Sequence, residues 1–238
     1  MSTIIRSGYA LDVSTTSLSE VADIIRYLDQ PLKQLKVTTR ALQSPTEMRN
    51  CLRTVSDRCS QLESLRLTIK RQGQAEEMSW FDLSPILLCS RIKKLEIKHP
   101  CVLPIVDDDI FTMLSSWENI EQLSLNAEPT DHSGQMPGLT LRSLAYVAQM
   151  GPNVREARFC LDLASSLPVS LSYSWSSLSI LHLGTSIVNA QTDVDLLNIA
   201  EFVNEVFPTA QLLTARREHY HVELEELLDL VRGRAATA

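Results

Sequence analysis

The sequence is poor in glycine and has no paired-cysteine motif. Only 7 of its 238 residues are glycine, which leaves little material for the glycine-rich turns that bring backbone amides close to a phosphate. Nucleotide-binding folds are therefore disfavoured. The cysteines form no C-x-x-C pair and lie mostly in apolar segments, so we expect them to be reduced core residues. They are Cys51, Cys59, Cys89, Cys101 and Cys160.

Long apolar runs are also missing. The first 16 residues lack the apolar stretch and the small-residue cleavage site of a signal peptide, and no run is long enough to span a bilayer. No N-x-[ST] glycosylation acceptor occurs either. These absences predict an intracellular protein, cytoplasmic or nuclear, with no membrane partner.

Positive charge is in deficit. The sequence has 22 lysines and arginines against 29 aspartates and glutamates, a net charge of -7. The molecule as a whole therefore repels nucleic acid and anionic membranes, and we expect neither as a partner. A hydrophobic content of 44% is ample for a continuous core, so the composition does not indicate disorder.

What the chain does have is a repeat. Seven segments carry apolar residues at offsets zero, three and five, and they begin at Leu32, Leu62, Ile92, Ile120, Val154, Leu178 and Ala210. Their starting positions are 24 to 34 residues apart. Alternation puts offsets three and five on one side of a short strand and offsets two, four and six on the other. Each segment is therefore predicted to be a half-buried strand.

Helical spacing of apolar residues separates several of these segments. It occurs in residues 21–28, 48–55, 110–117, 141–148 and 196–206. Asp107, Asp108 and Asp109 precede one such run, where a carboxylate can cap free amides. Pro152 and Pro208 follow two others and stop the helix. The repeating unit is thus predicted to be a strand followed by a helix.

One strand-helix unit cannot bury its own apolar face, so neighbouring units have to stack. The predicted fold is α/β, a curved leucine-rich-repeat solenoid with parallel strands on the concave face and helices on the convex face. We expect one domain over residues 1–238, with about seven to eight units and a capping helix and tail at residues 218–238. Residues 71–79 and 128–137 are predicted surface loops, and the unit at residues 161–177 is expected to lack a proper helix.

Several segments resemble the leucine-rich regions of fungal F-box-like proteins over roughly residues 20–215. They are DDDIFTMLSSWENIEQLSL, LTLRSLAYVAQMGPNVREARF and WSSLSILHLGTS. The resemblance implies that the repeats present a substrate for ubiquitination, while an F-box grips the adaptor of a cullin-RING ligase. No leucine- and proline-rich F-box segment precedes Leu32, so either the chain is a fragment or ligase attachment is lost. The asparagine of the common leucine-rich consensus is also missing at offset eight.

The candidate partner-binding residues follow from the alternation. The predicted concave positions carry six cations, Lys36, Arg66, Lys94, Lys98, Arg158 and Arg216, against Glu96 and Glu156, a local charge of +4 in a chain of -7. This contrast favours an acidic or phosphorylated protein segment as the ligand. The alternative is that short polar strands simply need soluble residues.

Other chemistry-bearing groups have simpler explanations. His219 and His221, near Glu218 and Glu223, suggest zinc, but no cysteine lies nearby in sequence and a surface histidine pair explains them. The three aspartates before Ile110 suggest a cation site, but capping accounts for their position.

Cys160 and His182 lie on neighbouring predicted strands as diagonal neighbours, an arrangement that could form a nucleophilic dyad. Trp80, Trp117 and Trp175 lie at unit boundaries, where packing is the simpler role than a ligand cage. No metal and no cofactor is predicted.

The sequence therefore favours a non-enzymatic protein-binding scaffold, one form of which is the substrate-recognition part of an F-box-type ubiquitin ligase receptor. A second hypothesis is a small hydrolase or transferase on an atypical α/β sheet. A third is a degenerate repeat protein that no longer binds a partner. An open strand face distinguishes the scaffold from the enclosed pocket of an enzyme.

Overall fold

The computed structural model describes residues 2–40, 44–70, 78–131, 136–163, 177–187, 193–214 and 219–235. Three residues singled out in the sequence, Trp175, Arg216 and Glu218, lie outside these ranges. So do most of the unit at residues 161–177 and parts of both predicted surface loops.

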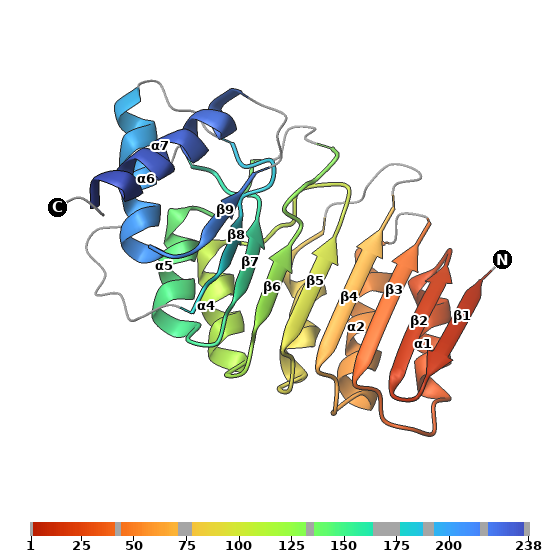
Figure 1. Ribbon diagram of the computed structural model, residues 1–238. Coiled ribbons are helices and arrows are strands. Elements are labelled where there is room, and N and C mark those ends of the chain that lie inside the picture. Colours follow the sequence, from red (N-terminus) through yellow and green to blue (C-terminus); the bar gives the residue numbers. More distant parts are fainter. Residues whose placement is uncertain are drawn as a thin grey trace.

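The architecture is α/β, with one nine-stranded sheet whose strands follow one another in chain order (Figure 1). β1 runs antiparallel to β2, and every later neighbouring pair is parallel. The strands are β1 (Thr3–Ser7), β2 (Ala10–Thr15), β3 (Gln34–Thr39), β4 (Ser64–Ile69), β5 (Lys94–Lys98), β6 (Gln122–Leu125), β7 (Glu156–Phe159), β8 (Ile180–His182) and β9 (Gln211–Leu213). The seven predicted strands correspond to β3 to β9.

From β3 to β8 the register of the parallel strands matches the alignment of the repeated segments. Leu35 pairs with Leu65, Leu65 with Leu95, and Leu95 with Leu123. All four leucines are buried, with at most 2% of their surface exposed. In these strands offsets three and five point into the core, as the alternation required. At β9 the alignment was wrong by one residue, because Leu181 pairs with Leu212 and not with Leu213.

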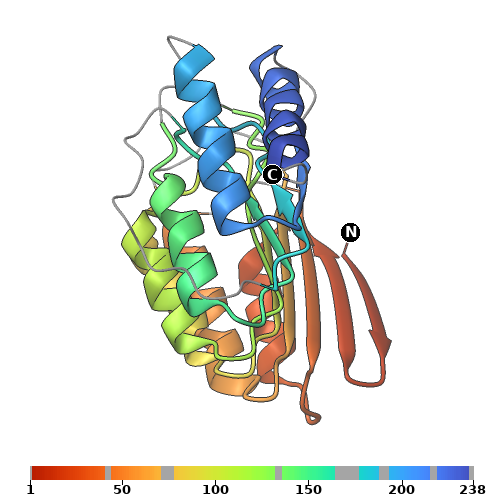
Figure 2. The same cartoon turned by 60° about the vertical axis from the view of Figure 1, so that its left-hand side comes forward.

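The helices are α1 (Leu18–Arg26), α2 (Pro45–Arg58), α3 (Trp80–Leu83), α4 (Asp107–Ser116), α5 (Leu141–Met150), α6 (Asp193–Val206) and α7 (His219–Ala235), the last of which follows β9. α1, α2, α4 and α5 connect successive strands and lie on one face of the sheet (Figure 2). Between β4 and β5 the described helices are short: α3 has one turn and a 3-10 helix follows it at Ser84–Leu88. The core lies between the sheet and this helical layer, and its largest buried side chains include Trp117, Phe159 and Phe207.

The described helices begin and end at capping and stop residues, not all of which were predicted. α2 begins with a capping box in which the Ser44 hydroxyl accepts the Glu47 N–H at 3.2 Å and the Glu47 carboxylate accepts the Ser44 N–H at 3.1 Å. Pro152 and Pro208 each lie two residues after the last residue of α5 and α6, at the helix ends where they were predicted.

The two ends of the chain add elements to the regular units. At the N-terminus, β1 and β2 form a hairpin whose turn contains Gly8 at a φ of 56°. This hairpin was not predicted, although Leu11 and Val13 of β2 alternate with polar residues and are buried. At the other end, α7 packs against α6 with Leu224 and Leu228 buried, so a terminal helix is present where one was predicted (Figure 1).

The cysteines and two tryptophans behave as predicted. All five cysteines are free thiols, and four are buried, whereas Cys101 is partly exposed. Burial raises the pKa of Cys51 and of Cys89 to about 12. Trp117 lies in the core and is 1% exposed. Trp80 is partly buried and packs against the core, so both tryptophans serve in packing.

Candidate binding face and pocket

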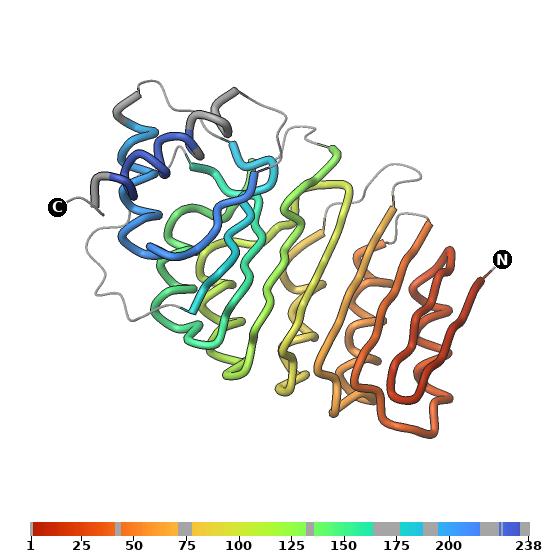
Figure 3. Tube along the Cα trace, viewed as in Figure 1, coloured from red at the N-terminus to blue at the C-terminus, as the bar shows by residue number. Residues whose placement is uncertain are grey.

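The candidate site is the face of the sheet turned away from α1, α2, α4 and α5, which we call the open face (Figure 3 traces the backbone in the same view as Figure 1). Strand pairing places one side chain from each of the strands β1 to β8 in a continuous line across this face. We call this line the central row, and it consists of Ile5, Asp12, Lys36, Arg66, Glu96, Ser124, Arg158 and His182.

The predicted cations lie on the open face but most are paired. Lys36 Nζ lies 2.6 Å from the Asp12 carboxylate of the neighbouring strand. Arg66 pairs with Glu96, and Arg158 with Glu156. Lys98 Nζ is 3.3 Å from a second Glu96 oxygen. Exposed pairs of this kind contribute only about 0–1 kcal/mol each to stability, so their main effect is on the field of the surface.

Asp12 is the acidic residue that the sequence argument missed, because β2 was not recognised as a strand. With it, the described open-face residues comprise five cations, Lys36, Arg66, Lys94, Lys98 and Arg158, and three carboxylates, Asp12, Glu96 and Glu156. The excess of positive charge is thus five minus three, or +2, for these residues, whereas the sequence alone gave five minus two, or +3, for the same set without Asp12. Lys94 lies at an exposed position of β5.

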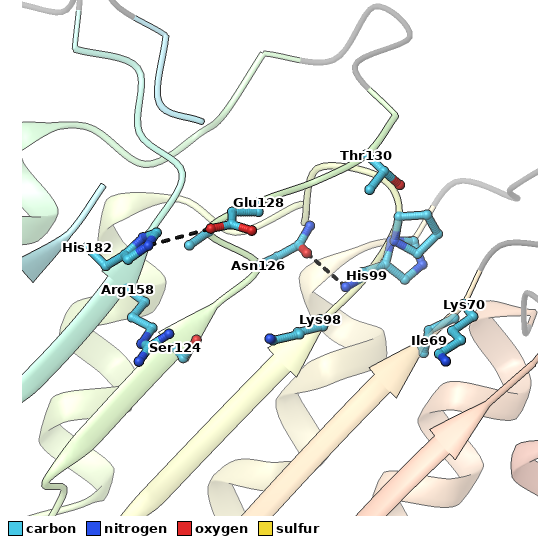
Figure 4. Close-up of a pocket in the computed structure, with 12 residues that line it drawn as sticks. Ile69, Lys70, Lys98, His99, Ser124, Asn126, Glu128, Thr130, Arg158 and His182 are labelled. Carbon is cyan, nitrogen blue, oxygen red and sulfur yellow. Dashed lines mark hydrogen bonds and ion pairs between the residues drawn. The ribbon is translucent and has the colours of Figure 1, made fainter. Parts of the chain in front are cut away.

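A pocket of about 320 Å³ lies where strands β4 to β8 end (Figure 4). Lys98 and Arg158 line it from β5 and β7, and His182 lines it from β8. Lys70, which follows β4, lines the opposite side, and Ser124 of β6 lines it from the central row. Parallel strands commonly bind ligands at their carboxyl ends, because side chains from several strands meet there.

Asn126 fixes the backbone at this edge. It adopts a φ of 49°, is 4% exposed, and directly follows β6. Its side-chain oxygen accepts the His99 N–H at 2.8 Å, and its amide nitrogen donates to the Cys101 carbonyl at 2.6 Å. Asn126 therefore ties the end of β6 to the chain leaving β5. The sequence offered a signal for it, a polar residue directly after an alternating strand, but its role depends on partners 25 and 27 residues away.

His182 is held in one tautomer. Its Nδ1 accepts the Gly184 N–H at 3.0 Å, so Nε2 carries the proton of the neutral ring and faces a Glu128 oxygen at 3.5 Å. Burial lowers the pKa of His182 and Arg158 also lowers it, whereas Glu128 raises it; the net shift is downward. The ring is therefore neutral at pH 7.

Cys160 and His182 have other partners than each other. The Cys160 thiol lies 3.6 Å from the Thr185 carbonyl, and burial raises its pKa to about 11. A thiol with such a pKa is almost wholly protonated at neutral pH and is a poor nucleophile. The structure thus assigns Cys160 to packing beside the Thr185 loop.

The three aspartates at the start of α4 each have a distinct protein partner. Asp109 accepts the Val106 N–H at 2.8 Å and so caps the helix. Asp107 accepts bonds from Thr140, and Asp108 lies 3.6 Å from Arg142. Across the described residues, His, Cys, Asp and Glu side chains form no cluster of three or more suited to a metal ion. The side chains of His219 and His221 lie outside the described part.

No protein-family model matches the sequence, and a comparison with curated proteins returns no match. Of the helices described here, none is both long enough and apolar enough to cross a membrane.

Proposed function

We propose that this chain is a leucine-rich-repeat solenoid that holds a protein partner on its open face. The observation that carries the proposal is the central row. Strand pairing delivers it as a continuous line of mostly polar side chains from β1 to β8. A surface shaped in this way is suited to an extended ligand, because successive strands offer successive contacts along one direction.

Two features support the interpretation of the chain as a repeat protein: leucines recur in register on neighbouring strands, and helices follow most of the strands. Stacked units of this type bury one common core and leave the strand face for binding. A second hollow, of about 340 Å³, lies on the open face near β1 to β4 and is lined by Ile5, Lys36 and Arg66. The open face therefore offers two recesses joined by the central row.

The ligand that fits this face is an acidic or phosphorylated protein segment. The described open-face residues keep an excess of cations although the whole chain is acidic. Complementary charge of this kind speeds encounter and selects partners more than it adds affinity. More specifically, the chain would be the substrate-recognition part of an F-box-type ubiquitin ligase receptor. This part of the proposal rests only on the resemblance of the chain's segments to the leucine-rich regions of F-box-like proteins.

The test is affinity capture with charge-reversal variants, Arg66→Glu and Arg158→Glu made separately, followed by mass spectrometry. Arg53→Glu is the matched control, because Arg53 is an exposed cation on α2 and so lies on the helical side of the sheet. We expect proteins that bind wild type and Arg53→Glu to be depleted at least tenfold with either open-face variant, as the loss of a charge pair predicts.

An identical set of captured proteins for wild type and both open-face variants would overturn the scaffold proposal. A cullin-ligase adaptor among the captured proteins supports the ligase form. A reproducible partner without that adaptor contradicts the ligase form and keeps the scaffold.

A further inference from the structure

The pocket at the ends of β4 to β8 contains a hydroxyl with an unused hydrogen bond. Ser124 as a residue is only 3% exposed, lines the pocket, and makes no hydrogen bond with any described residue. Its hydroxyl oxygen is not one of the fully buried, unpartnered side-chain atoms of the described residues, so it is accessible from the pocket. A polar group that enters the pocket can therefore bond to it.

Cations surround this hydroxyl from different strands. Arg158 is the strand-pairing neighbour of Ser124, and its Nε donates to Glu156 while its two Nη groups have no described partner. Lys98 lines the pocket from β5 and Lys70 from the end of β4 (Figure 4). A group seated over Ser124 therefore meets three cations in one pocket, although Lys98 and Arg158 also contact the carboxylates Glu96 and Glu156.

The nearby carboxylates are already engaged. Glu96, the other strand-pairing neighbour of Ser124, is held between Arg66 and Lys98 and is only 14% exposed. Glu128 lines the pocket beside His182, 3.5 Å from its Nε2. The charged residues that line the pocket are therefore three cations and one carboxylate, a net positive charge that favours an anion.

We propose that this pocket binds a phosphorylated side chain of the partner, with Ser124 donating to one phosphate oxygen and Arg158 and Lys98 neutralising its charge. This inference rests on the proposed function and specifies the ligand group that the open face selects. A phosphate monoester carries a charge of about -1.5 to -2 and three acceptor oxygens, which suits cations arriving from several strands. A carboxylate is planar and is best matched by a single arginine fork.

The test uses phenyl phosphate as the probe and the whole chain, with binding followed through the chemical shifts of the His182 ring in NMR spectra. We expect saturable shifts, with Arg158→Met weakening binding at least tenfold because a charge-assisted hydrogen bond is worth about 1.5–3 kcal/mol. Ser124→Ala is expected to weaken it about threefold to tenfold, as for one neutral hydrogen bond.

Two controls separate the pocket from general charge effects. Lys36→Met removes an open-face cation that lines the other recess and leaves phenyl phosphate binding unchanged. Benzoate, a monoanion with the same ring, binds at least tenfold more weakly than phenyl phosphate. Equal binding of benzoate overturns the choice of phosphate, and unchanged binding to Arg158→Met overturns the site.

The experiment also separates this inference from the scaffold proposal, because phenyl phosphate needs no protein partner. If capture of partners depends on Arg66 while the His182 signals do not respond to phenyl phosphate, the pocket inference fails and the scaffold stands. Melting temperatures of the variants, measured on the same samples, show whether lost binding reflects lost folding.

Discussion

At the scale of single residues, Gly184 carries the tightest constraint in the loop that follows β8. Its φ is 51°, and a Cβ at this position would overlap the Ala127 carbonyl oxygen. Gly184→Ala therefore has to displace backbone as well as adopt a strained conformation, and we expect a loss of about 2–4 kcal/mol in unfolding free energy. Chemical denaturation measures it.

Gly8 provides the matched control for that prediction. It has a similar φ of 56°, but nothing lies within 4 Å of a Cβ built on it. Gly8→Ala is expected to cost only about 1 kcal/mol, the conformational strain alone. Equal losses for the two variants would show that the close approach to Ala127 is unimportant.

Asp82 gives a residue-scale prediction about pH. Burial raises its pKa, but hydrogen bonds from Ser79 and Arg49 outweigh burial and leave the pKa below its ordinary value. A carboxyl with a lowered folded-state pKa stabilises the protein above its unfolded pKa of about 4, and that stabilisation is lost as the pH falls through the folded value. The stability advantage of wild type over Asp82→Asn is therefore expected to be constant from pH 5 to 7 and to shrink below pH 4.

The difference in stability between wild type and Asp82→Asn is measured from urea unfolding midpoints at a series of pH values. Arg49→Met, which removes the partner and keeps most of the side-chain length, is expected to lose stability and to show a weaker acid dependence than wild type. An advantage over Asp82→Asn that stays the same down to pH 3 would contradict the assignment of Asp82.

At the scale of elements, the start of one helix is bonded to the start of the next. The Asp107 carboxylate at the first residue of α4 accepts the Thr140 N–H at 2.9 Å and the Thr140 hydroxyl at 2.7 Å, at the N-cap of α5. Asp107→Ala is expected to cost about 1–2 kcal/mol, as for loss of a helix cap. Asp108→Ala, which removes an exposed carboxylate 3.6 Å from Arg142, is expected to cost less than about 0.5 kcal/mol. Equal losses in thermal or urea unfolding would contradict this role of Asp107.

Elements differ in how far the sequence predicts them. β3 to β7 follow from alternation, because their inward residues are large and apolar and the outward ones polar. β1 could not be found in this way: all five of its residues are exposed, including Ile4 and Ile5, so it has no buried face to leave a pattern. The partners of Lys36 and Arg66 depend on strand register, which brings together residues 24 and 30 positions apart. The roles of Ser124 and Asn126 could not be predicted without those registers.

At the scale of the whole molecule, the chain-ordered sheet limits each strand to its immediate neighbours. β5 lies between β4 and β6 and buries Leu95 and Ile97, whereas β1 pairs only with β2 and buries none of its residues. In a stack of this kind, stability is the sum of local terms and nearest-neighbour terms, so the end opens at a lower free energy than the middle.

Amide hydrogen exchange resolves this distribution strand by strand. We expect peptides that cover β1 to exchange at least a hundredfold faster than peptides that cover β5, which corresponds to a difference of about 3 kcal/mol in opening free energy. Leu95→Ala leaves a cavity beside two neighbouring strands and is expected to cost about 2–5 kcal/mol, with protection lost first in β4 to β6. Protection that falls equally in all strands would show that the sheet opens as one cooperative unit, and the nearest-neighbour account of its stability would be wrong.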